Sequence, residues 1–156
     1  HAALERAQDA ARADGLTGLL NRRAFDQDLP YAWAQEDLQL AVIDVDGLKR
    51  VNDTEGHGQG DKLLTVFAQA LKAEVGGLGQ AYRLGGDEFA VLTAEAADTL
   101  LEWVDIATQV ARQAVLASVG ASVGVASRAE AAQPDALLSL ADARMYDMKR
   151  RVQAPR

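Results

Sequence analysis

The segment Tyr82-Arg83-Leu84-Gly85-Gly86-Asp87-Glu88-Phe89-Ala90-Val91-Leu92 places a Gly-Gly pair between two short apolar runs. Glycine accepts the positive φ angles that tight turns demand, so the pattern predicts a β-hairpin with its turn at Gly85 and Gly86. Glycines also leave the backbone open to a ligand, and the acids Asp87 and Glu88 follow at once. A plain hairpin would explain the glycines but does not require the acids. The turn is therefore a candidate ligand site as well as a fold element.

The segments on either side of the hairpin predict helices and strands in mixed order. Apolar residues recur at helical spacing in four segments, one further segment has the apolar character of a buried strand, and another alternates at strand spacing. The expected elements are a helix capped by Asn21 and kinked or shortened by Pro30, a strand over Leu38–Val45, a helix from about Leu64 that stops at Gly76, a helix over about Glu95–Ala114, a strand over Val119–Val125, and a helix after Pro134. This order predicts an α+β fold, with a central, mostly antiparallel sheet flanked by helices.

The composition is that of a single globular domain that does not bind nucleic acid. The chain has 156 residues and a net charge of -7, whereas proteins that neutralise a polynucleotide backbone need clustered Lys and Arg. No apolar stretch approaches the roughly 18 residues of a membrane span, and the lack of Cys fits a reducing compartment. Residues 1–13 are expected to be either the end of an N-terminal linker or stalk helix or a frayed remnant, with the domain itself over residues 14–156.

The strand Leu40-Ala41-Val42-Ile43-Asp44-Val45-Asp46 ends in two carboxylates. Residues two apart on a strand face the same side, so Asp44 and Asp46 could share a ligand. A carboxylate buried among such apolar neighbours needs a cation or strong hydrogen bonds. The alternative is that both acids only end the strand, and Asp46 is the better candidate for that role.

Residues 47–61, expected to form a loop rich in Gly and polar residues, mix cations, amides and acids. Lys49 can neutralise phosphate charge, and Asn52 and Asp61 offer the donors and acceptors that a guanine edge requires. Asp61 could equally cap the helix that follows. For His57, which has no Cys or second His nearby, a hydrogen bond within the loop is favoured over a metal ligand.

Five segments, in this order, resemble the GGDEF family of diguanylate cyclases from about Asp14 to Lys149. They are Asp14-Gly15-Leu16-Thr17-Gly18-Leu19-Leu20-Asn21-Arg22-Arg23, Asp44 to Asp61, Arg83 to Phe89, Ser122-Val123-Gly124-Val125-Ala126, and Ala141-Asp142-Ala143-Arg144-Met145-Tyr146-Asp147-Met148-Lys149. The resemblance implies a fold similar to nucleotidyl cyclase and polymerase palm domains. It also implies a bacterial signalling enzyme that condenses two GTP into cyclic di-GMP and two pyrophosphates.

The resemblance assigns roles to the candidate residues. Asp44 and Asp87, with the carbonyl of Val45, would bind two Mg²⁺ or Mn²⁺ ions. Asp87, Glu88 and Lys49 would be catalytic, and Asp87 is the candidate that accepts the proton of the attacking 3′-hydroxyl, with a metal-bound hydroxide as the alternative. GTP would contact Gly85 and Gly86 in the hairpin. Asn52 and Asp61 would recognise its guanine, with His57 in the same loop. Lys49 and Lys149 would face its triphosphate, with backbone contacts from Gly47 and Leu48.

The same resemblance implies the partners. One hairpin would hold one GTP, so two domains must face each other as a homodimer. An upstream sensory domain is expected in the full-length protein; the domain itself is expected to be cytoplasmic, with membrane anchoring of the whole protein left open. The alternative function is a catalytically silent member that binds GTP or mediates dimerisation, and the intact Asp44, Asp87 and Glu88 argue against it.

The chain departs from the family pattern at two places. Many members carry an inhibitory product site, Arg-x-x-Asp, where this sequence has Gly76-Gly77-Leu78-Gly79. Glycine cannot replace an arginine that grips phosphate, so no inhibitory product site is predicted here. The family also often has Gly-Arg-Asn where this chain has Val152-Gln153-Ala154, and the sequence leaves open whether Arg150 or Arg151 supplies the missing cation.

Overall fold

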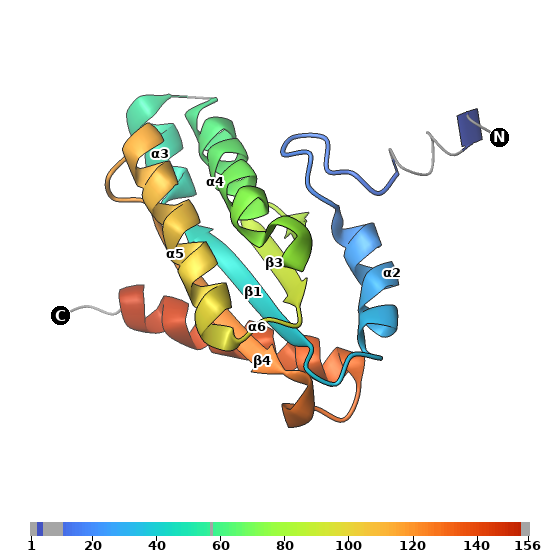
Figure 1. The fold of residues 1–156 in the computed structure, drawn as a ribbon. Helices are drawn as coiled ribbons and strands as arrows, with labels where there is room; N and C mark the ends of the chain where they lie inside the picture. Colours follow the sequence, from blue (N-terminus) through green and yellow to red (C-terminus); the bar gives the residue numbers. More distant parts are fainter. Residues whose placement is uncertain (1–2, 5–10, 57, 154–156) are drawn as a thin grey trace.

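A four-stranded antiparallel sheet forms the centre of the computed structural model, which describes residues 3–4, 11–56 and 58–153 (Figure 1). The strands lie in the order β2-β3-β1-β4. Their bounds are β1 Gln39–Asp46, β2 Gly79–Gly85, β3 Glu88–Thr93 and β4 Gly120–Ser127. Since β1 pairs with β3 on one side and with β4 on the other, it is a central strand. The predicted α+β fold is confirmed.

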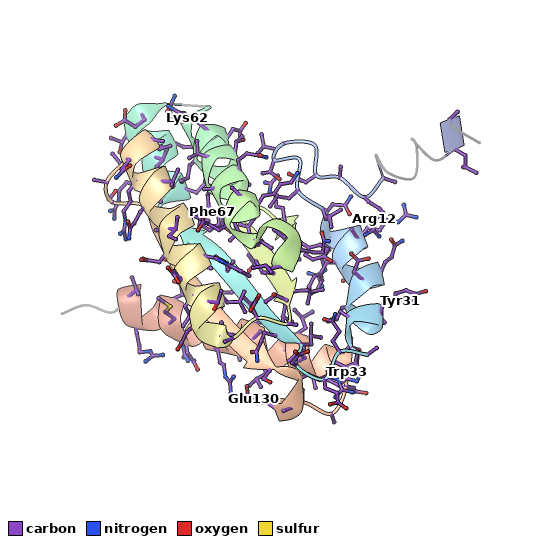
Figure 2. The ribbon with its side chains drawn as sticks, viewed as in Figure 1. Arg12, Tyr31, Trp33, Lys62, Phe67 and Glu130 are labelled. Atoms are coloured by element: carbon purple, nitrogen blue, oxygen red, sulfur yellow. The ribbon has the colours of Figure 1, made fainter. Side chains whose placement is uncertain are left out.

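Helices cover both faces of the sheet (Figure 1). One face packs against α4 (Gln59–Val75) and α5 (Ala97–Ala114), and the other against α2 (Arg22–Ala32) and α6 (Pro134–Gln153). In Figure 2, Phe67 of α4 points toward the sheet, where it is fully buried, whereas Tyr31 of α2 points away from the protein and is 84% exposed. Two buried clusters, one on each face, thus make up the core.

The sequence of β1 explains its place in the centre. Its residues alternate between the two clusters, with Ala41, Ile43 and Val45 in one and Leu40 and Val42 in the other. A strand that is apolar on both sides must be covered on both sides. By the same alternation, the acids that follow Val42 at even positions lie on the side of α6.

The N-terminal helix begins as the sequence predicted. The side chain of Asn21 accepts a hydrogen bond from the amide of Ala24 at 2.9 Å and caps α2. The helix ends at Ala32, two residues after Pro30, and Trp33 is its C-cap. The predicted hairpin is present, but its turn lies at Gly86 and Asp87 rather than at Gly85 and Gly86, because Gly85 still pairs at the end of β2. The helices before and after the hairpin are also present, with ends shifted by a few residues. Most of the segment 1–13 lies outside the described residues, and within it residues 11–13 form a turn and a bridging residue.

The predicted loop over residues 47–61 was partly wrong, because Leu48–Glu55 forms a helix, α3. Its N-cap is Gly47 at φ 101°, and no side chain caps it. Val51 is the only buried residue of this eight-residue helix. One buried position gives no apolar periodicity from which a helix could be predicted. Two short 3₁₀ segments, η1 Gly76–Leu78 and η2 Arg128–Glu130, complete the described elements. None of the helices in the described ranges has the length and apolar character that a membrane crossing requires.

Candidate functional site

The end of β1 and the hairpin turn meet at one edge of the sheet. Asp44 lies opposite Glu88 in the β1–β3 register, and the amide of Val45 donates to the carbonyl of Asp87 at 2.9 Å. These pairings bring together two acidic segments that are more than forty positions apart in the sequence. The structure therefore joins Asp44, Val45, Asp87 and Glu88 into a single site.

Asp44 is a buried acid with one cationic neighbour and one acidic neighbour. Its carboxylate accepts a hydrogen bond from Nζ of Lys149 on α6. Burial, together with the adjacent Asp87 carboxylate, raises the pKa of Asp44 to about 6, although the Lys149 ammonium acts in the opposite direction. Two carboxylates held against each other favour a shared cation, because like charges at short distance raise the free energy of the ionised pair.

Glu88 lies in the same negative environment. Burial is the main cause that raises the pKa of Glu88, and the charges of Asp142 and Asp87 add to it. A cation bound between the hairpin and β1 would relieve part of this repulsion. The placement is consistent with the sequence-based grouping of Glu88 with Asp87.

Asp46 ends β1 and is held by the neighbouring strand. Its Oδ2 accepts a hydrogen bond from the buried hydroxyl of Ser122 on β4 at 2.9 Å. Its Oδ1 is buried and has no hydrogen-bond partner among the described residues. The sequence suggested a structural role for Asp46 without indicating Ser122 as its partner, because only the β1–β4 register brings them together.

The carboxylate and carbonyl oxygens at this edge of the sheet fit a hard divalent cation that takes its remaining ligands from water or substrate. No group of three or more His, Cys, Asp and Glu side chains is arranged to hold a metal within the described ranges. Mg²⁺ commonly uses one or two protein carboxylates and completes its octahedron with water and substrate phosphates. Asp44 and Asp87 supply such a pair, and the Val45 carbonyl belongs to the same strand end.

The predicted guanine readers are brought together by the packing of α3 against α4. Oδ1 of Asn52 accepts a hydrogen bond from the amide of Gly60 at 2.9 Å, and Asp61 follows in the first turn of α4. A Cβ on Gly60 would lie 2.4 Å from Oδ1 of Asn52, so only glycine permits this approach. Asp61 is not the N-cap of α4, which is Gly58. His57 lies outside the described residues.

Lys49 stands on the exposed side of α3. With Gly47, Arg50, Asp53 and Thr54 it lines a hollow of about 400 Å³. Two cations on one rim suit an anionic ligand, as the prediction for Lys49 requires. Leu48, the other backbone candidate, packs partly into the core and anchors this end of α3.

The tip of the hairpin is tied to the N-terminal turn by Arg83. Its guanidinium donates to the carbonyl of Gly86 and also contacts both oxygens of Asp14. Asp14 in turn accepts hydrogen bonds from the amide and hydroxyl of Thr17, at 2.9 and 2.7 Å. Neither Arg83 nor Asp14 had a role predicted from the sequence. An Asp-x-x-Thr turn is a local signal, but its partner in the hairpin is visible only in the folded chain.

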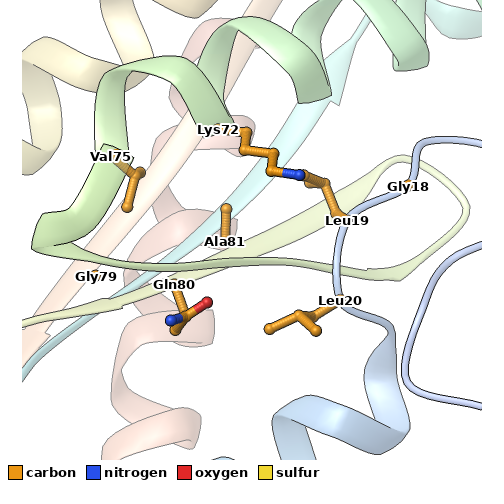
Figure 3. Close-up of a pocket in the computed structure, with 9 residues that line it drawn as sticks. Gly18, Leu19, Leu20, Lys72, Val75, Gly79, Gln80 and Ala81 are labelled. Carbon is orange, nitrogen blue, oxygen red and sulfur yellow. The ribbon is translucent and has the colours of Figure 1, made fainter. Parts of the chain in front are cut away.

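The Gly76–Gly79 region borders a small cavity of about 220 Å³ (Figure 3). Gly76 and Gly79 contribute only backbone, and Lys72 is the one charged side chain among the nine lining residues. The arginine and aspartate of the family's product site have no counterpart in this lining. Arg150, one of the two candidates for the missing C-terminal cation, is ion-paired with Asp147 on the surface of α6.

Comparisons with known proteins show the family to which the chain belongs. The family model described as "Diguanylate cyclase, GGDEF domain" matches residues 11–154. The chain is 35% identical to diguanylate cyclase DgcS of Shewanella oneidensis, over 89% of this chain and 50% of that protein. It is 32% identical to diguanylate cyclase VdcA of Vibrio cholerae, over 94% of this chain and 46% of that protein. It thus spans about half the length of these relatives.

Solved structures show the same architecture. The coiled coil and GGDEF domain of DgcB from Caulobacter crescentus, in complex with c-di-GMP, matches with a TM-score of 0.83 and 30% identity, over 96% of this chain and 86% of that one. Diguanylate cyclase SiaD from Pseudomonas aeruginosa, in complex with its activator SiaC, matches with a TM-score of 0.79 and 30% identity, over 96% of this chain and 63% of that one.

Proposed function

Because the chain belongs to the GGDEF family of diguanylate cyclases, we propose that it condenses two GTP into cyclic di-GMP and releases two pyrophosphates. The observation that carries the proposal is the junction of Asp44 and Asp87 at the end of β1, where a buried carboxylate faces a second acid. A merely structural strand end does not need two acids in contact. A catalytic site for phosphoryl transfer does.

Asp44 and Asp87, with the carbonyl of Val45, would hold two Mg²⁺ or Mn²⁺ ions. Bound there, the ions would polarise the α-phosphate, lower the pKa of the attacking 3′-hydroxyl and stabilise the leaving pyrophosphate. In each half-reaction the 3′-oxygen forms a bond to the α-phosphorus of the other GTP, the bond from that phosphorus to pyrophosphate breaks, and Asp87 accepts the hydroxyl proton. Glu88 would add a third acidic side chain beside Asp44 and Asp87.

The nucleotide would lie from the hairpin turn to the α3–α4 junction. Gly85 and Gly86 leave the turn open to the ribose and phosphates, and both have positive φ angles that suit glycine. Asn52 and Asp61 would recognise guanine, with His57 in the same loop. Lys49 and Lys149 would face the triphosphate, and Gly47 and Leu48 would add backbone contacts.

Each domain presents one hairpin, so we propose that two copies face each other during catalysis. The rate per protein should then fall on dilution, in parallel with the loss of the dimer in sedimentation experiments. Turnover that stays constant in demonstrably monomeric samples would contradict this. Since the chain spans about half of its curated relatives, we also propose an upstream sensory domain in the full-length protein, with the cyclase domain in the cytoplasm.

Purified protein incubated with GTP and Mg²⁺ tests the activity directly. We expect cyclic di-GMP and pyrophosphate from the wild type, no product from Asp87→Ala, and wild-type product from Asp105→Ala. Asp105 is a matched control because it is an exposed acid on α5 that contacts only Gln109 through its side chain among the described residues. GTP binding without product in the wild type would identify a silent member of the family instead.

A further inference from the structure

The ammonium group of Lys149 lies where a metal ion bound to Asp44 would lie. Its Nζ donates to Oδ2 of Asp44, and the side chains of the pair are 31% and 3% exposed, respectively. A buried carboxylate is costly unless a positive group faces it, and in this structure the ammonium group is that partner. An ammonium and a divalent ion at the same oxygen repel each other, so a cation that takes Oδ2 of Asp44 as a ligand has to displace Nζ.

Asp46 offers the displaced ammonium a second partner. It lies two residues from Asp44 on β1 and therefore on the same face. Ser122 holds its Oδ2, whereas its Oδ1 is buried without a partner among the described residues. An unmatched buried acceptor costs free energy, which a donor such as Nζ would recover. The hydrogen bond to Asp44 is the main cause that raises the pKa of Lys149, and the charges of Asp87 and, least, Asp46 add to it.

We propose that Lys149 is a latch, which stands in for the metal at Asp44 in the metal-free protein and moves to Asp46 when a divalent cation binds without nucleotide, leaving it free to face the triphosphate once GTP binds. The inference rests on the proposed function, because it requires the metal site at Asp44 and Asp87. Only the lysine side chain has to move. Met148, the residue before it, ties α6 to β4, because the amide of Val123 donates to its sulfur at 3.3 Å.

Titration of Mn²⁺ into the protein without nucleotide tests the latch without relying on activity. Lys149→Met removes the competing charge, so we expect Mn²⁺ to bind on the order of tenfold more tightly than to the wild type. Lys149→Gln should behave in the same way and serves if the methionine variant does not fold. Lys72→Met, which removes an exposed lysine at the far end of α4, should leave the Mn²⁺ affinity unchanged.

A double-mutant cycle tests the role of Asp46. Asp46→Asn should weaken Mn²⁺ binding in the wild type, because the displaced lysine loses its acceptor, and should have a much smaller effect in the Lys149→Met background. If Asp46→Asn acted only by removing negative charge near the ion, its effect would be equal in both backgrounds, and that result would overturn the proposal.

The remaining outcomes separate the latch from the metal site. Wild-type binding that Lys149→Met leaves unchanged or weakens overturns the latch alone. Failure of both proteins to bind Mn²⁺, or binding that survives Asp44→Asn, overturns the metal site and the latch with it. Binding by Lys149→Met in the absence of wild-type binding supports the latch, since the lysine then excludes the ion completely.

Discussion

Arg83 and Asp14, 69 positions apart in the chain, form a partly buried ion pair in which Nη1 lies 3.2 Å from both carboxylate oxygens. The two side chains are only 15% and 18% exposed. The same guanidinium donates from Nε and Nη2 to the carbonyl of Gly86, at 3.0 and 2.8 Å. The hairpin turn, which contains Gly86 and Asp87, is thus held by Arg83 of β2, and Asp14 holds Arg83 in turn.

Arg83→Met should lower the free energy of unfolding by about 1–3 kcal/mol, because it leaves Asp14 and the Gly86 carbonyl without their charged donor. Arg83→Lys should recover only part of this loss, since an ammonium group cannot reproduce the planar fork that spans both partners. Urea denaturation measures both. Arg22→Met is the control, because Arg22 forms an exposed pair with Asp26; an equal loss in both methionine variants would refute the role of Arg83.

The stability contributed by Asp14 should depend on pH. Burial raises the pKa of Asp14, but hydrogen bonds from Thr17 and Arg83 outweigh it, and the pKa lies below the usual 3.8. A carboxyl whose pKa is lower in the folded state stabilises the fold above its unfolded pKa, and this contribution is lost as the pH falls through the folded value. Asp14→Asn should therefore be less stable than the wild type at pH 7, and the two should converge below about pH 4. A difference that grows on acidification would be inconsistent with this account.

Gly60→Ala should weaken GTP binding more than it slows the chemical step. The new Cβ would lie 2.4 Å from Oδ1 of Asn52 and 2.8 Å from Cδ1 of Leu48, so Asn52 has to shift. We expect KM for GTP to rise about tenfold, which is the range for loss of one polar contact to a base, with a smaller change in kcat. Gly15→Ala is the control, because a Cβ there meets no atom within 4 Å. A fall in kcat at unchanged KM would show that Asn52 does not read the substrate.

Cyclic di-GMP should not inhibit the protein through the Gly76–Gly79 segment, and placing Arg and Asp there should not create the inhibitory site. A Cβ on Gly79 would lie 2.4 Å from the carbonyl oxygen of Leu92, and Gly76 has a φ of 52°, which strains any other residue. The double variant Gly76→Arg, Gly79→Asp should consequently lose stability by more than about 1 kcal/mol without gaining tight binding of cyclic di-GMP. Calorimetric titration of wild type and variant with cyclic di-GMP checks this, and tight binding by the wild type at this face would contradict it.

Much of the fold could be predicted because its signals are local. The Asn21 cap, the glycine that ends α4 and the alternation of the hairpin strands each depend on a few neighbouring residues. Helix α3 could not be predicted, since it is short, begins at a glycine with left-handed backbone and buries only Val51. It packs against α4, where Oδ1 of Asn52 accepts a hydrogen bond from the amide of Gly60, and no local pattern contains this contact.

The hairpin, the order of the elements and the acids at two strand ends follow from local sequence, because backbone preferences and apolar periods act over a few residues. The pairing of Asp44 with Asp87, the neutralisation of Asp44 by Lys149 and the hydrogen bond from Ser122 to Asp46 arise only when the whole chain folds. These relationships depend on strand register and on the docking of α6. The strand register and the position of α6 are fixed because both faces of the sheet must be buried under helices at the same time. Residues from the whole chain contribute to that burial.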